Sequence, residues 1–515
     1  MKGRPAEYKP LSFTTTLRNP ERIKDFLKIL AQYEGMNMTD SVIMCVVRDL
    51  IRKQLYTPMY VSRIERLKIK TQIDEYFTDE EVNEIIDNSP QKHKEAGFEW
   101  GWPSRFDTWY KFPMELGFIY YAMNKPIEIS ATGHMLIESE DESIKEHQVY
   151  ANALVKYQTN NPFRKVLNEN VPFVLFLQVL NMLKDDKEEP DAGISKHEIP
   201  LFICWRDNNA KALYEMIKSV REKWGFGVSD EAIYDICLEQ LGATSDDENR
   251  FKMNKIAKES TDEFIRKMKY TGLITLRGFG RFVDVNMIEI NKIKYILENY
   301  MLYEKYFDSY SYFKYMGTMD TEIINIETQA VVPRIDVIDS LDKWVDYYDW
   351  EVITKELRVV CAAQPCKDDV LKFINGPLRL EFLTSIALKK KFNKLIVKPN
   401  YTIDDEGLPT SHAGGGVADI ECFDIEYNSL FEVTLLTGTQ QNIREMPSIC
   451  RHLKTAKETN GNTFSVLVTP RLHPDTTEYA KFAKFKDDLD VLTFGINDFI
   501  SKIESIDQMS SILIS

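Results

Sequence analysis

A chain of 515 residues is too long for one compact core, and its length favours two to four domains. A hydrophobic content of 43% with 12% aromatic residues is ordinary for a globular protein and excludes wholesale disorder. The formal net charge of −15 argues against a nucleic-acid partner, because such proteins usually carry a strongly basic balance.

The acidic residues are unevenly distributed along the chain. They concentrate in polar stretches at Thr78–Glu81, Glu138–Glu146, Asp185–Asp191 and Ser245–Glu248, which are typical of solvated loops or helix starts. Basic runs remain elsewhere, including Lys389–Lys391. Because contact with phosphate requires only a local positive face, the net charge does not exclude DNA as a partner.

Targeting and cysteine features favour a cytoplasmic protein. No apolar run approaches the length of a membrane span, and the first residues, MKGRPAEYKP, lack the apolar segment of a signal peptide. The seven cysteines are scattered, and the one close pair, Cys361 and Cys366, has nothing nearby that completes a zinc set. We therefore expect a reduced, cytoplasmic protein.

Residues 1–150 have the pattern of a helix-rich subdomain with a β-hairpin. Apolar residues at helical spacing follow Pro20 and Thr39, and Thr78–Glu81 has the composition of a helix start. Two short strands are expected at Gly117–Tyr121 and Ile127–Ser130. Helices followed by such a hairpin are the outline of a winged helix, and such domains bind DNA by placing a helix in the major groove.

The same subdomain contains two candidate DNA-binding residues, Arg105 and Lys111, which lie where contacts to phosphates or bases would be useful. For any single basic residue, a solvated surface position is the commoner role. Of the neighbouring segments, residues 8–16 have strand character, and Trp100–Tyr110 is aromatic and rich in turn residues.

Residues 151–286 repeat this order of elements and are expected to form a second winged-helix-like subdomain. Val171–Leu183 is an apolar helix, and Gly193–Lys196 has the composition of a tight turn. The runs LITL and RFVDV predict two strands joined by a glycine-rich tip. Arg277 and Arg281 flank that tip and suit contacts to the DNA backbone.

The last two regions differ in pattern from the first two. Residues 287–346 are aromatic and helical in pattern and predict a helical connector, whose tyrosines are better suited to packing than to stacking on bases. In residues 347–515 helices and strands alternate, which predicts an α/β domain. The whole chain is therefore expected to be multidomain α+β, with a helix-rich recognition region before the α/β domain.

The elements of the α/β domain can be placed from their flanking residues. Asn375, Gly376 and Pro377 begin a helix that runs to about Phe392, and a further helix begins after Pro447. The strands are expected near Lys394–Pro399, Val417–Ile425, Leu430–Leu436, Thr463–Thr469 and Val491–Phe494.

Three carboxylates of this domain, Glu381, Asp419 and Glu432, are candidate metal ligands. Asp419 and Glu432 lie on two apolar runs that predict neighbouring strands, and Glu381 lies on the preceding helix. Strand cores rarely carry acids without a use, because burying a carboxylate without a partner is costly. Acids from adjacent strands and a helix can share one Mg²⁺, which would activate water and stabilise charge on a phosphate.

The spacing of five residues carries a family resemblance. Glu381, Asp419, Glu432, Glu445 and His452 occur within LEFLTSIALKKKF, HAGGGVADIECFDIEYNSLFEVTLLTG and QQNIREMPSICRHL. This series resembles the cleavage domain of type IIS restriction endonucleases of the AlwI, PleI and MlyI group and their nicking relatives. The resemblance recurs more weakly in LRNPERIKDFLKILAQYEGM and FIRKMKYTGLITLRGFGRFVDVN. It implies a C-terminal PD-(D/E)xK-type nuclease domain, with an αβββαβ core, and an N-terminal DNA-recognition region.

Roles for the site residues follow from their chemistry together with the resemblance. Asp419 and Glu432 would be metal ligands with the backbone carbonyl of Val433, and Glu381 would reach the same metal directly or through water. Glu445 and His452 match the distal positions of the family and would orient water, support the ligands or bind a second metal. Without the resemblance, these two residues would be a helix-start acid and a helical histidine.

One position departs from the general nuclease motif. Thr434 stands where a lysine usually follows the second acid, so the general base is unassigned, with Gln440, Gln441 and Lys454 as loose candidates. The run from His412 to Gly416 could bring backbone N–H groups to a phosphate, although a flexible lead into the strand is as well supported.

Together these features predict a Mg²⁺-dependent, sequence-specific endonuclease that cuts double-stranded DNA at a fixed distance outside an asymmetric site. One catalytic centre per chain implies one strand cut per engagement, so a double-strand break would need a second subunit, a transient homodimer or a sequential reaction. Strand nicking is a further expectation. The alternatives are a PD-(D/E)xK repair or defence nuclease without sequence specificity, and a winged-helix DNA-binding protein with an inactive nuclease domain.

Overall fold

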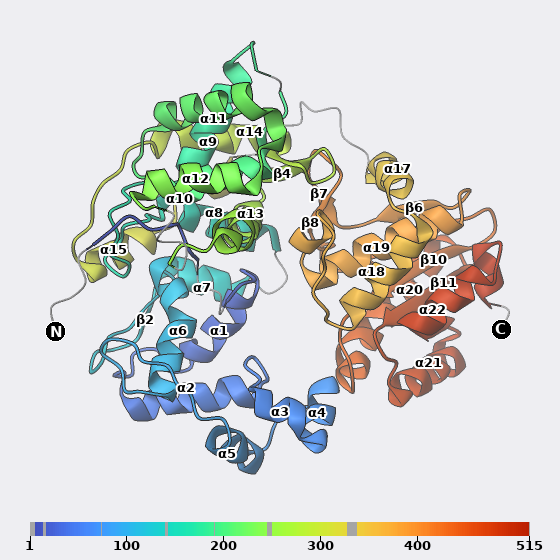
Figure 1. Ribbon diagram of the computed structural model, residues 1–515. Helices are drawn as coiled ribbons and strands as arrows, with labels where there is room; N and C mark the ends of the chain where they lie inside the picture. The colour runs from blue at the N-terminus through green and yellow to red at the C-terminus, as the bar shows by residue number, and fades with distance from the viewer. Residues whose placement is uncertain are drawn as a thin grey trace. The chain divides into compact units, whose positions relative to one another are not determined.

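The computed structural model describes residues 6–13, 17–73, 75–139, 143–189, 191–244, 250–326 and 337–513. The chain divides into two compact units (Figure 1). Unit 1 holds Met1–Leu50 with Pro90–Val332, and unit 2 holds Ile51–Ser89 with Pro333–Ser515. No helix in the described ranges is long and apolar enough to cross a membrane.

Unit 1 is built mainly from helices. Its α-helices are α1 (Arg22–Ala31), most of α2 (Asp40–Arg52), α6 (Trp102–Glu115), α7 (Ala131–Glu138), α8 (Ser143–Lys156), α9 (Pro172–Asp185), α10 (Ile199–Cys204), α11 (Ala210–Trp224), α12 (Asp230–Leu241), α13 (Thr261–Lys269), α14 (Ile290–Asn299), α15 (Ser309–Met316) and α16 (Thr321–Asn325). Short 3₁₀ turns occur at Lys196–Glu198, Gly225–Gly227 and Met287–Glu289, and a π-helical segment at Lys255–Ser260 precedes α13.

Helix α9 forms part of the core of unit 1. Its sequence PFVLFLQVLNMLKD is apolar on nearly every side, which is typical of a helix surrounded by others. It packs against α8, α10, α11 and α14 and against β5. The sequence predicted an apolar helix at Val171–Leu183, and its apolar composition accounts for its burial among other helices.

Two small sheets complete unit 1. Strands β1 (Ile119–Tyr120) and β2 (Glu128–Ile129) pair antiparallel, as expected for the first hairpin. Strands β3 (Ile194–Ser195), β4 (Ile274–Arg277) and β5 (Phe282–Val285) form a sheet in the order β3–β5–β4. The tip between β4 and β5 has positive φ at Gly278, Phe279 and Gly280, and glycine adopts this conformation at low cost.

Three local expectations for unit 1 are wrong. Trp100–Tyr110 is not a turn: it lies largely within α6, because Pro103 in the first turn is compatible with a helix and the aromatic rings pack along one face. Gly193–Lys196 contains β3, which pairs with β5. A strand was expected at residues 8–16, of which 14–16 lie outside the described residues. Residues 8–13 form no strand, and the N–H of Leu11 donates a backbone hydrogen bond to the carbonyl of Ile203.

Unit 2 contains a five-stranded mixed sheet with helices on both faces. The strands of that sheet are β6 (Ile396–Pro399), β9 (Ile420–Phe423), β10 (Asn428–Val433), β11 (Thr463–Thr469) and β12 (Val491–Gly495). Two further strands of unit 2, β7 (Thr402–Ile403) and β8 (Pro409–Ser411), form a separate hairpin. Its α-helices are α3 (Met59–Arg63), α4 (Glu65–Gln72), α5 (Asp79–Asp87), α17 (Val337–Tyr347), α18 (Trp350–Cys361), α19 (Gly376–Lys391), α20 (Met446–Thr459), α21 (Pro474–Asp487) and α22 (Ile496–Glu504). Shorter turns lie at Leu371–Phe373, Gln441–Glu445 and Met509–Leu513.

The sheet order is β12–β11–β10–β9–β6, with antiparallel pairing from β6 to β10 and parallel pairing from β10 to β12. The parallel strands are joined through α20 and α21, since a parallel connection needs a crossover. The predicted strands and helices of this domain are all present, although β9 and β10 are shorter than expected. The hairpin β7–β8, inserted between β6 and β9, was not expected.

Alternation along β10 assigns its side chains to the two faces of the sheet. Leu430 packs in a cluster with Ile449 and Leu453 of α20, while the ring of Phe431 lies 6.0 Å from that of Phe499 on α22. Glu432 must therefore point to the same face as Leu430, toward α20. One residue of slip in β10 would turn this carboxylate away from α20.

The start of α19 provides a test of the local fold. The side chain of Asn375 accepts a hydrogen bond of 3.0 Å from the N–H of Leu378, which caps the helix that carries Glu381. Asn375→Ala is expected to destabilise unit 2 by about 1 kcal/mol, because the freed N–H loses its partner. The shift of the urea midpoint measures this, with Asn375→Asp, which keeps the acceptor, as the control. Equal midpoints for both variants would contradict the cap.

Candidate active site

The site of unit 2 is assembled by one helix and two antiparallel strands. Glu381 lies on α19, whose residues from Leu378 to Leu388 are all buried. Glu432 lies in β10, and Asp419 immediately precedes β9. The register pairs Phe431 with Ile420, so one step further along the strands places Asp419 opposite Glu432. The Oδ2 atom of Asp419 accepts a 2.8 Å hydrogen bond from the N–H of Val433, which fixes this end of the strand pair.

Asp419 has the most perturbed acid–base equilibrium of the site. The residue keeps partial exposure, but its carboxyl group lies within the protein, and burial raises its pKa well above the usual value. The negative charges of Glu381, Glu432 and Glu445 raise it further, against the opposing hydrogen bond from Val433. The pKa of Glu432 is also raised by burial, although His452 lowers it, and burial raises the pKa of Glu445.

Two histidines hold two of these carboxylates. The Nδ1 atom of His452, on α20, lies 2.7 Å from Oε1 of Glu432. Two of the candidate site residues are therefore in contact. The Nδ1 atom of His412 lies 2.5 Å from Oε1 of Glu381. The sequence had suggested a role for His412 only through the glycine run that follows it. Its contact with Glu381 depends on the β7–β8 hairpin, which places residue 412 directly after β8.

Glu445 is connected to the position where a lysine is usual. The hydroxyl of Thr434 donates a 3.2 Å hydrogen bond to Oε1 of Glu445. Of the loose candidates for the general base, Gln441 is buried and uses its side chain to join Leu436, Thr469 and Arg471, and Lys454 pairs with Asp487 at 2.8 Å. These contacts give Gln441 a structural role.

The basic run at the end of α19 is also engaged within unit 2. Lys390 and Lys391 donate hydrogen bonds to the carbonyls of Val345 and Glu504, and Lys389 lies 3.6 Å from a carboxylate oxygen of Asp342. Cations at a helix C-terminus are favourably placed relative to the helix dipole. These lysines therefore stabilise α19 and its neighbours.

The donor chemistry of the site suits a hard divalent cation. All the candidate side-chain donors are carboxylate oxygens, whose mutual repulsion a cation would relieve. Oε2 of Glu381 is buried and has no hydrogen-bond partner, which is the kind of atom that a bound ion would satisfy. Across the described residues, no group of three or more His, Cys, Asp or Glu is arranged to hold a metal as it stands. Glu381 and Glu432 are instead turned toward their histidines.

The candidate DNA-binding residues occur at two places in unit 1. Arg105 lies over the ring of Trp109 and contacts His93 at 2.9 Å, and Lys111 lies 4.0 Å from Glu95. Both line one cavity. The other two residues, Arg277 and Arg281, flank the β4–β5 tip: Arg277 ends β4 and Arg281 immediately precedes β5.

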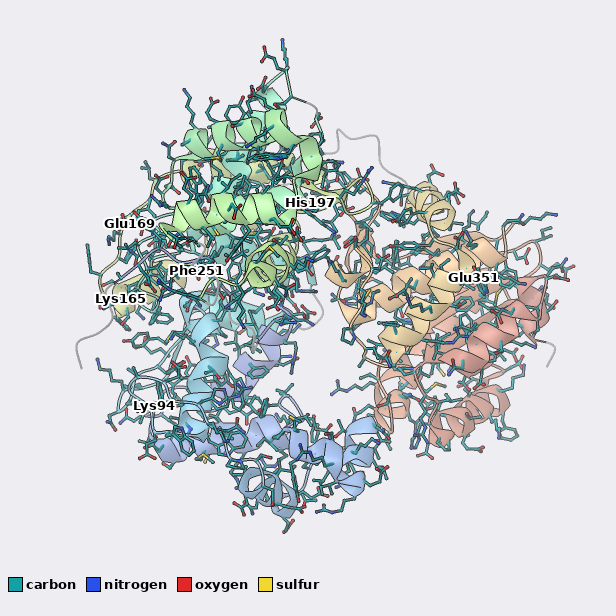
Figure 2. The ribbon with its side chains drawn as sticks, in the orientation of Figure 1. Lys94, Lys165, Glu169, His197, Phe251 and Glu351 are labelled. Atoms are coloured by element: carbon teal, nitrogen blue, oxygen red, sulfur yellow. The ribbon has the colours of Figure 1, made fainter. Side chains whose placement is uncertain are left out.

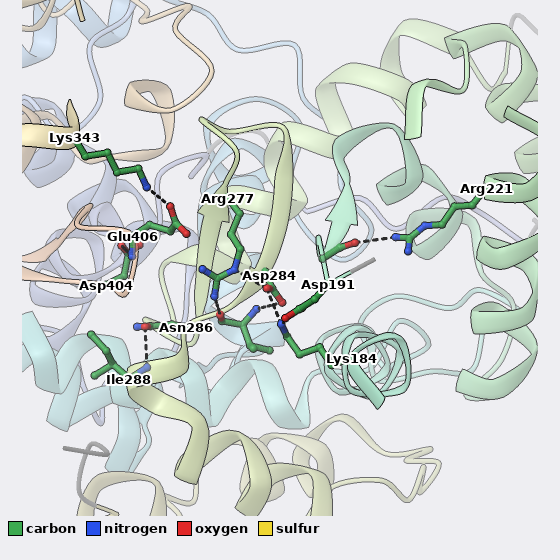
Figure 3. A network of polar contacts seen from close by, with 12 residues as sticks. Lys184, Asp191, Arg221, Arg277, Asp284, Asn286, Ile288, Lys343, Asp404 and Glu406 are labelled. Carbon is green, nitrogen blue, oxygen red and sulfur yellow. Dashed lines mark hydrogen bonds and ion pairs between the residues drawn. The ribbon is translucent and has the colours of Figure 1, made fainter. Parts of the chain in front are cut away.

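Arg277 is tied into the hairpin that carries it. Figure 3 shows Arg277 and Lys184 converging on the buried carboxylate of Asp284, at 2.6 and 2.9 Å. Arg277 also donates to the carbonyl of Val285. Arg281 is exposed, and its Nε atom donates to the carbonyl of Gly278. DNA contact by these arginines stays a prediction.

Acidic side chains grouped at one end of neighbouring strands are typical of hydrolytic enzymes that act on phosphate esters with a metal. A family model described as AlwI restriction endonuclease matches residues 114–338 and 366–491. Because this match spans about two thirds of the chain, the protein belongs to the AlwI restriction endonuclease family, which confirms the resemblance seen in the sequence. Membership places it among the DNA endonucleases. The second matched range includes every predicted residue of the acidic site.

Solved structures show weaker similarity. The small subunit of the heterodimeric restriction endonuclease R.BspD6I is 22% identical, with 30% of this chain and 77% of that chain covered and a TM-score of 0.27. Restriction endonuclease FokI is 13% identical, with 100% and 98% covered and a TM-score of 0.25. FokI bound to DNA is 11% identical, with 99% and 97% covered and a TM-score of 0.24. No curated protein matches the chain.

The raised pKa of Asp419 makes the stability of the metal-free protein depend on pH. A carboxyl group whose folded pKa is raised contributes fully below its ordinary value of 3.8, and that contribution is lost as pH rises through the folded pKa. Asp419→Asn keeps the hydrogen-bond acceptor and removes the charge. In EDTA at pH 8, we therefore expect this variant to melt several degrees above wild type, on the scale of roughly 2–4 °C per kcal/mol.

The difference should shrink at pH 5, where Asp419 is closer to its protonated form. Glu421→Gln is the matched control, because Glu421 lies on β9 but pairs with Lys398 at 2.6 Å. A lower melting temperature for Asp419→Asn than for wild type at pH 8 would contradict a destabilising repulsion between Asp419 and the neighbouring carboxylates.

Proposed function

We propose that the chain is a Mg²⁺-dependent, sequence-specific endonuclease that cuts double-stranded DNA at a fixed distance outside an asymmetric site. Family membership supports the general activity. The observation that supports the metal-dependent mechanism is the group of carboxylates around Asp419, which repel one another and leave Oε2 of Glu381 without a partner. A protein retains such an arrangement at a cost in stability, and acid–base perturbation of this kind concentrates at functional sites.

In this proposal Asp419, Glu432 and Glu381 hold Mg²⁺, together with the carbonyl oxygen of Val433. When bound, the ion supplies activation of water and stabilisation of the charge that develops on the phosphate. The hydrogen bond from Val433 N–H holds Asp419 at the end of the strand pair. The register of β9 and β10 therefore fixes Asp419, Glu432 and Val433, and helix α19 supplies Glu381.

His452 is a positioning residue for Glu432. Its Nδ1 contact orients the carboxylate, and partners of metal ligands commonly act in this way. We propose that His412 positions Glu381 in the same way, through its Nδ1 contact with that carboxylate. His412 is not one of the five residues of the family series.

Glu445 is the group that we propose to position the attacking water. Thr434 cannot act as an ammonium does, but its hydroxyl holds Glu445, and burial raises the pKa of that carboxyl toward the range of a general base. The side chain at the usual lysine position thus contributes indirectly, by orienting an acid.

Recognition and cleavage would be divided between different parts of the chain. We propose that the winged-helix-like hairpins of unit 1 contact DNA, with Arg105, Lys111, Arg277 and Arg281 as candidate residues, and that a PD-(D/E)xK-like domain within unit 2 cuts it. One acidic site per chain cuts one strand per engagement. A double-strand break would then require a transient homodimer, a second subunit or a sequential reaction, and an enzyme that stops after one strand would be a nickase.

The two alternatives predict different products. A repair or defence nuclease without sequence specificity would leave ends at unrelated sequences. A DNA-binding protein with an inactive nuclease domain would shift DNA mobility without cutting. The presence of Glu381, Asp419 and Glu432 together favours an active nuclease domain over an inactive one.

The decisive experiment is digestion of a defined plasmid with Mg²⁺, followed by sequencing of the ends. Wild type is expected to give ends at a constant offset from one short motif. Asp419→Ala should lower the cleavage rate by roughly 10³-fold, since it removes a proposed ligand of the Mg²⁺ that would stabilise the charge on the phosphate. Glu421→Ala, which removes a carboxylate two residues away on β9, should retain wild-type cleavage. Ends at unrelated sequences would exclude sequence-specific cleavage. DNA binding by wild type without cleavage would exclude endonuclease activity.

Replacement of His452 tests the positioning role. His452→Ala should raise the Mg²⁺ concentration for half-maximal cleavage by roughly 10–100-fold, because Glu432 loses the contact that orients it. His452→Asn, which can present an N–H near the same place, should recover part of the loss. A fall in cleavage rate with an unchanged Mg²⁺ requirement would contradict the role given to His452.

A further inference from the structure

Unit 1 contains a cavity of about 590 Å³ whose lining is rich in cations. The N-terminal segment, the loop before α6, one face of α6, the turn after α8 and the π-helical segment all contribute to it. Its lysines and arginines are Lys9, Arg105, Lys111, Arg164, Lys165 and Lys255, against one acid in the lining, Glu95. In a chain with a net charge of −15, this concentration of positive charge is local and marked.

The cations come from segments that are far apart in the sequence. Arg105, Thr108 and Lys111 share one face of α6, since they are spaced three residues apart. Lys165 lies in the turn after α8, and Lys255 opens the π-helical segment. Figure 2 labels Lys165 and Lys94, a neighbour of the cavity residue His93, on the same side of unit 1. Tertiary folding, and not a basic run in the sequence, therefore creates the positive cavity.

Part of this charge is neutralised within unit 1. Arg164 pairs with the buried carboxylate of Glu115 at 3.1 Å, and Lys9 lies 3.3 Å from Glu7. Lys111 lies 4.0 Å from Glu95, the one acid of the lining. Lys165 and Lys255 are exposed, and neither makes an ion pair with any residue that the structure describes. These two lysines are therefore available to an external anion.

His93 lines the same cavity, next to Arg105. Burial and the positive charge of Arg105 lower the pKa of its imidazole, against a smaller opposing effect of Glu95. Its Nδ1 atom is buried and has no hydrogen-bond partner. The lining of the cavity thus carries an excess of positive charge, which an oxyanion would offset.

We propose that this cavity binds phosphates of the DNA backbone and anchors the duplex independently of its sequence. The proposal rests on the proposed function, in which DNA is the substrate, and it assigns to unit 1 a contact separate from base recognition. Phosphate contacts fix the position of a protein on the duplex without carrying sequence information. The volume of the cavity and its hydroxyl and apolar lining, which includes Ser12, Thr108 and Phe163, suit a phosphate with its sugar.

The test measures binding without cleavage. A labelled duplex is titrated with the full-length protein in EDTA at salt concentrations between 50 and 200 mM. The double variant Lys165→Ala with Lys255→Ala should bind at least 10-fold more weakly at 50 mM salt. The slope of log affinity against log salt should fall in magnitude by roughly 1–2, since each lost phosphate contact contributes about 0.9. The loss should be equal for duplexes with and without the recognition motif.

Lys294→Ala is the matched control, because Lys294 is an exposed lysine of unit 1 on α14, outside the lining of the cavity. It should bind with the wild-type slope. Circular dichroism of each variant establishes that the substitutions leave the fold intact. An unchanged slope in the double variant would overturn the assignment of the cavity to DNA.

The outcomes separate this inference from the proposed function. If wild type cuts DNA and the double variant binds with the wild-type slope, the nuclease stands and the cavity assignment falls. If the slope falls as expected and wild type never cuts, the cavity assignment stands and the nuclease falls. Inorganic phosphate and ATP are the probes for a free ligand. If ATP binds more tightly than the duplex, and the double variant loses that binding, the cavity serves a nucleotide and not the DNA backbone.

Discussion

The repulsion among carboxylates around Asp419 is the constraint on which the site of unit 2 depends. Folding places Glu381, Glu432 and Glu445 close enough to Asp419 for their charges to raise its pKa, in a region where water screens them poorly. The protein compensates only in part, through the histidine contacts and the N–H of Val433. The repulsion among these carboxylates therefore lowers the stability of unit 2 unless a proton or a cation neutralises part of their charge.

The sheet explains how such a costly group can be held in place. Strand β10 has an antiparallel neighbour on one side and a parallel neighbour on the other. Its pairing with β9 sets Asp419 beside Glu432, and the crossover through α20 brings His452 over the same face. Leu430 and Phe431 bury both faces of the strand, so the hydrophobic effect fixes the register that brings the acids together.

The two units also divide the electrostatics. Unit 2 gathers acids around Asp419, where their charges raise the pKa of its carboxyl group. Unit 1 gathers cations in a cavity despite the acidic composition of the chain. Net charge alone therefore misrepresents this protein, because contact with phosphate depends on the local field rather than on the sum over all residues.

The sequence by itself determined the strands of the five-stranded sheet and the helix α19, and it named the candidate acidic residues. Alternating apolar runs and the Asn375 cap predicted the strands and α19, because periodicity and capping are local properties. The family series identified Glu381, Asp419, Glu432, Glu445 and His452, but no local pattern assigned what each one contacts.

Only the tertiary structure decided the contact of His412 with Glu381, the link from Thr434 to Glu445 and the structural role of Gln441. It also showed that Trp100–Tyr110 is helical and that the cations of unit 1 converge on one cavity. These features join residues that are distant along the chain, and such pairings depend on packing that no sequence window contains.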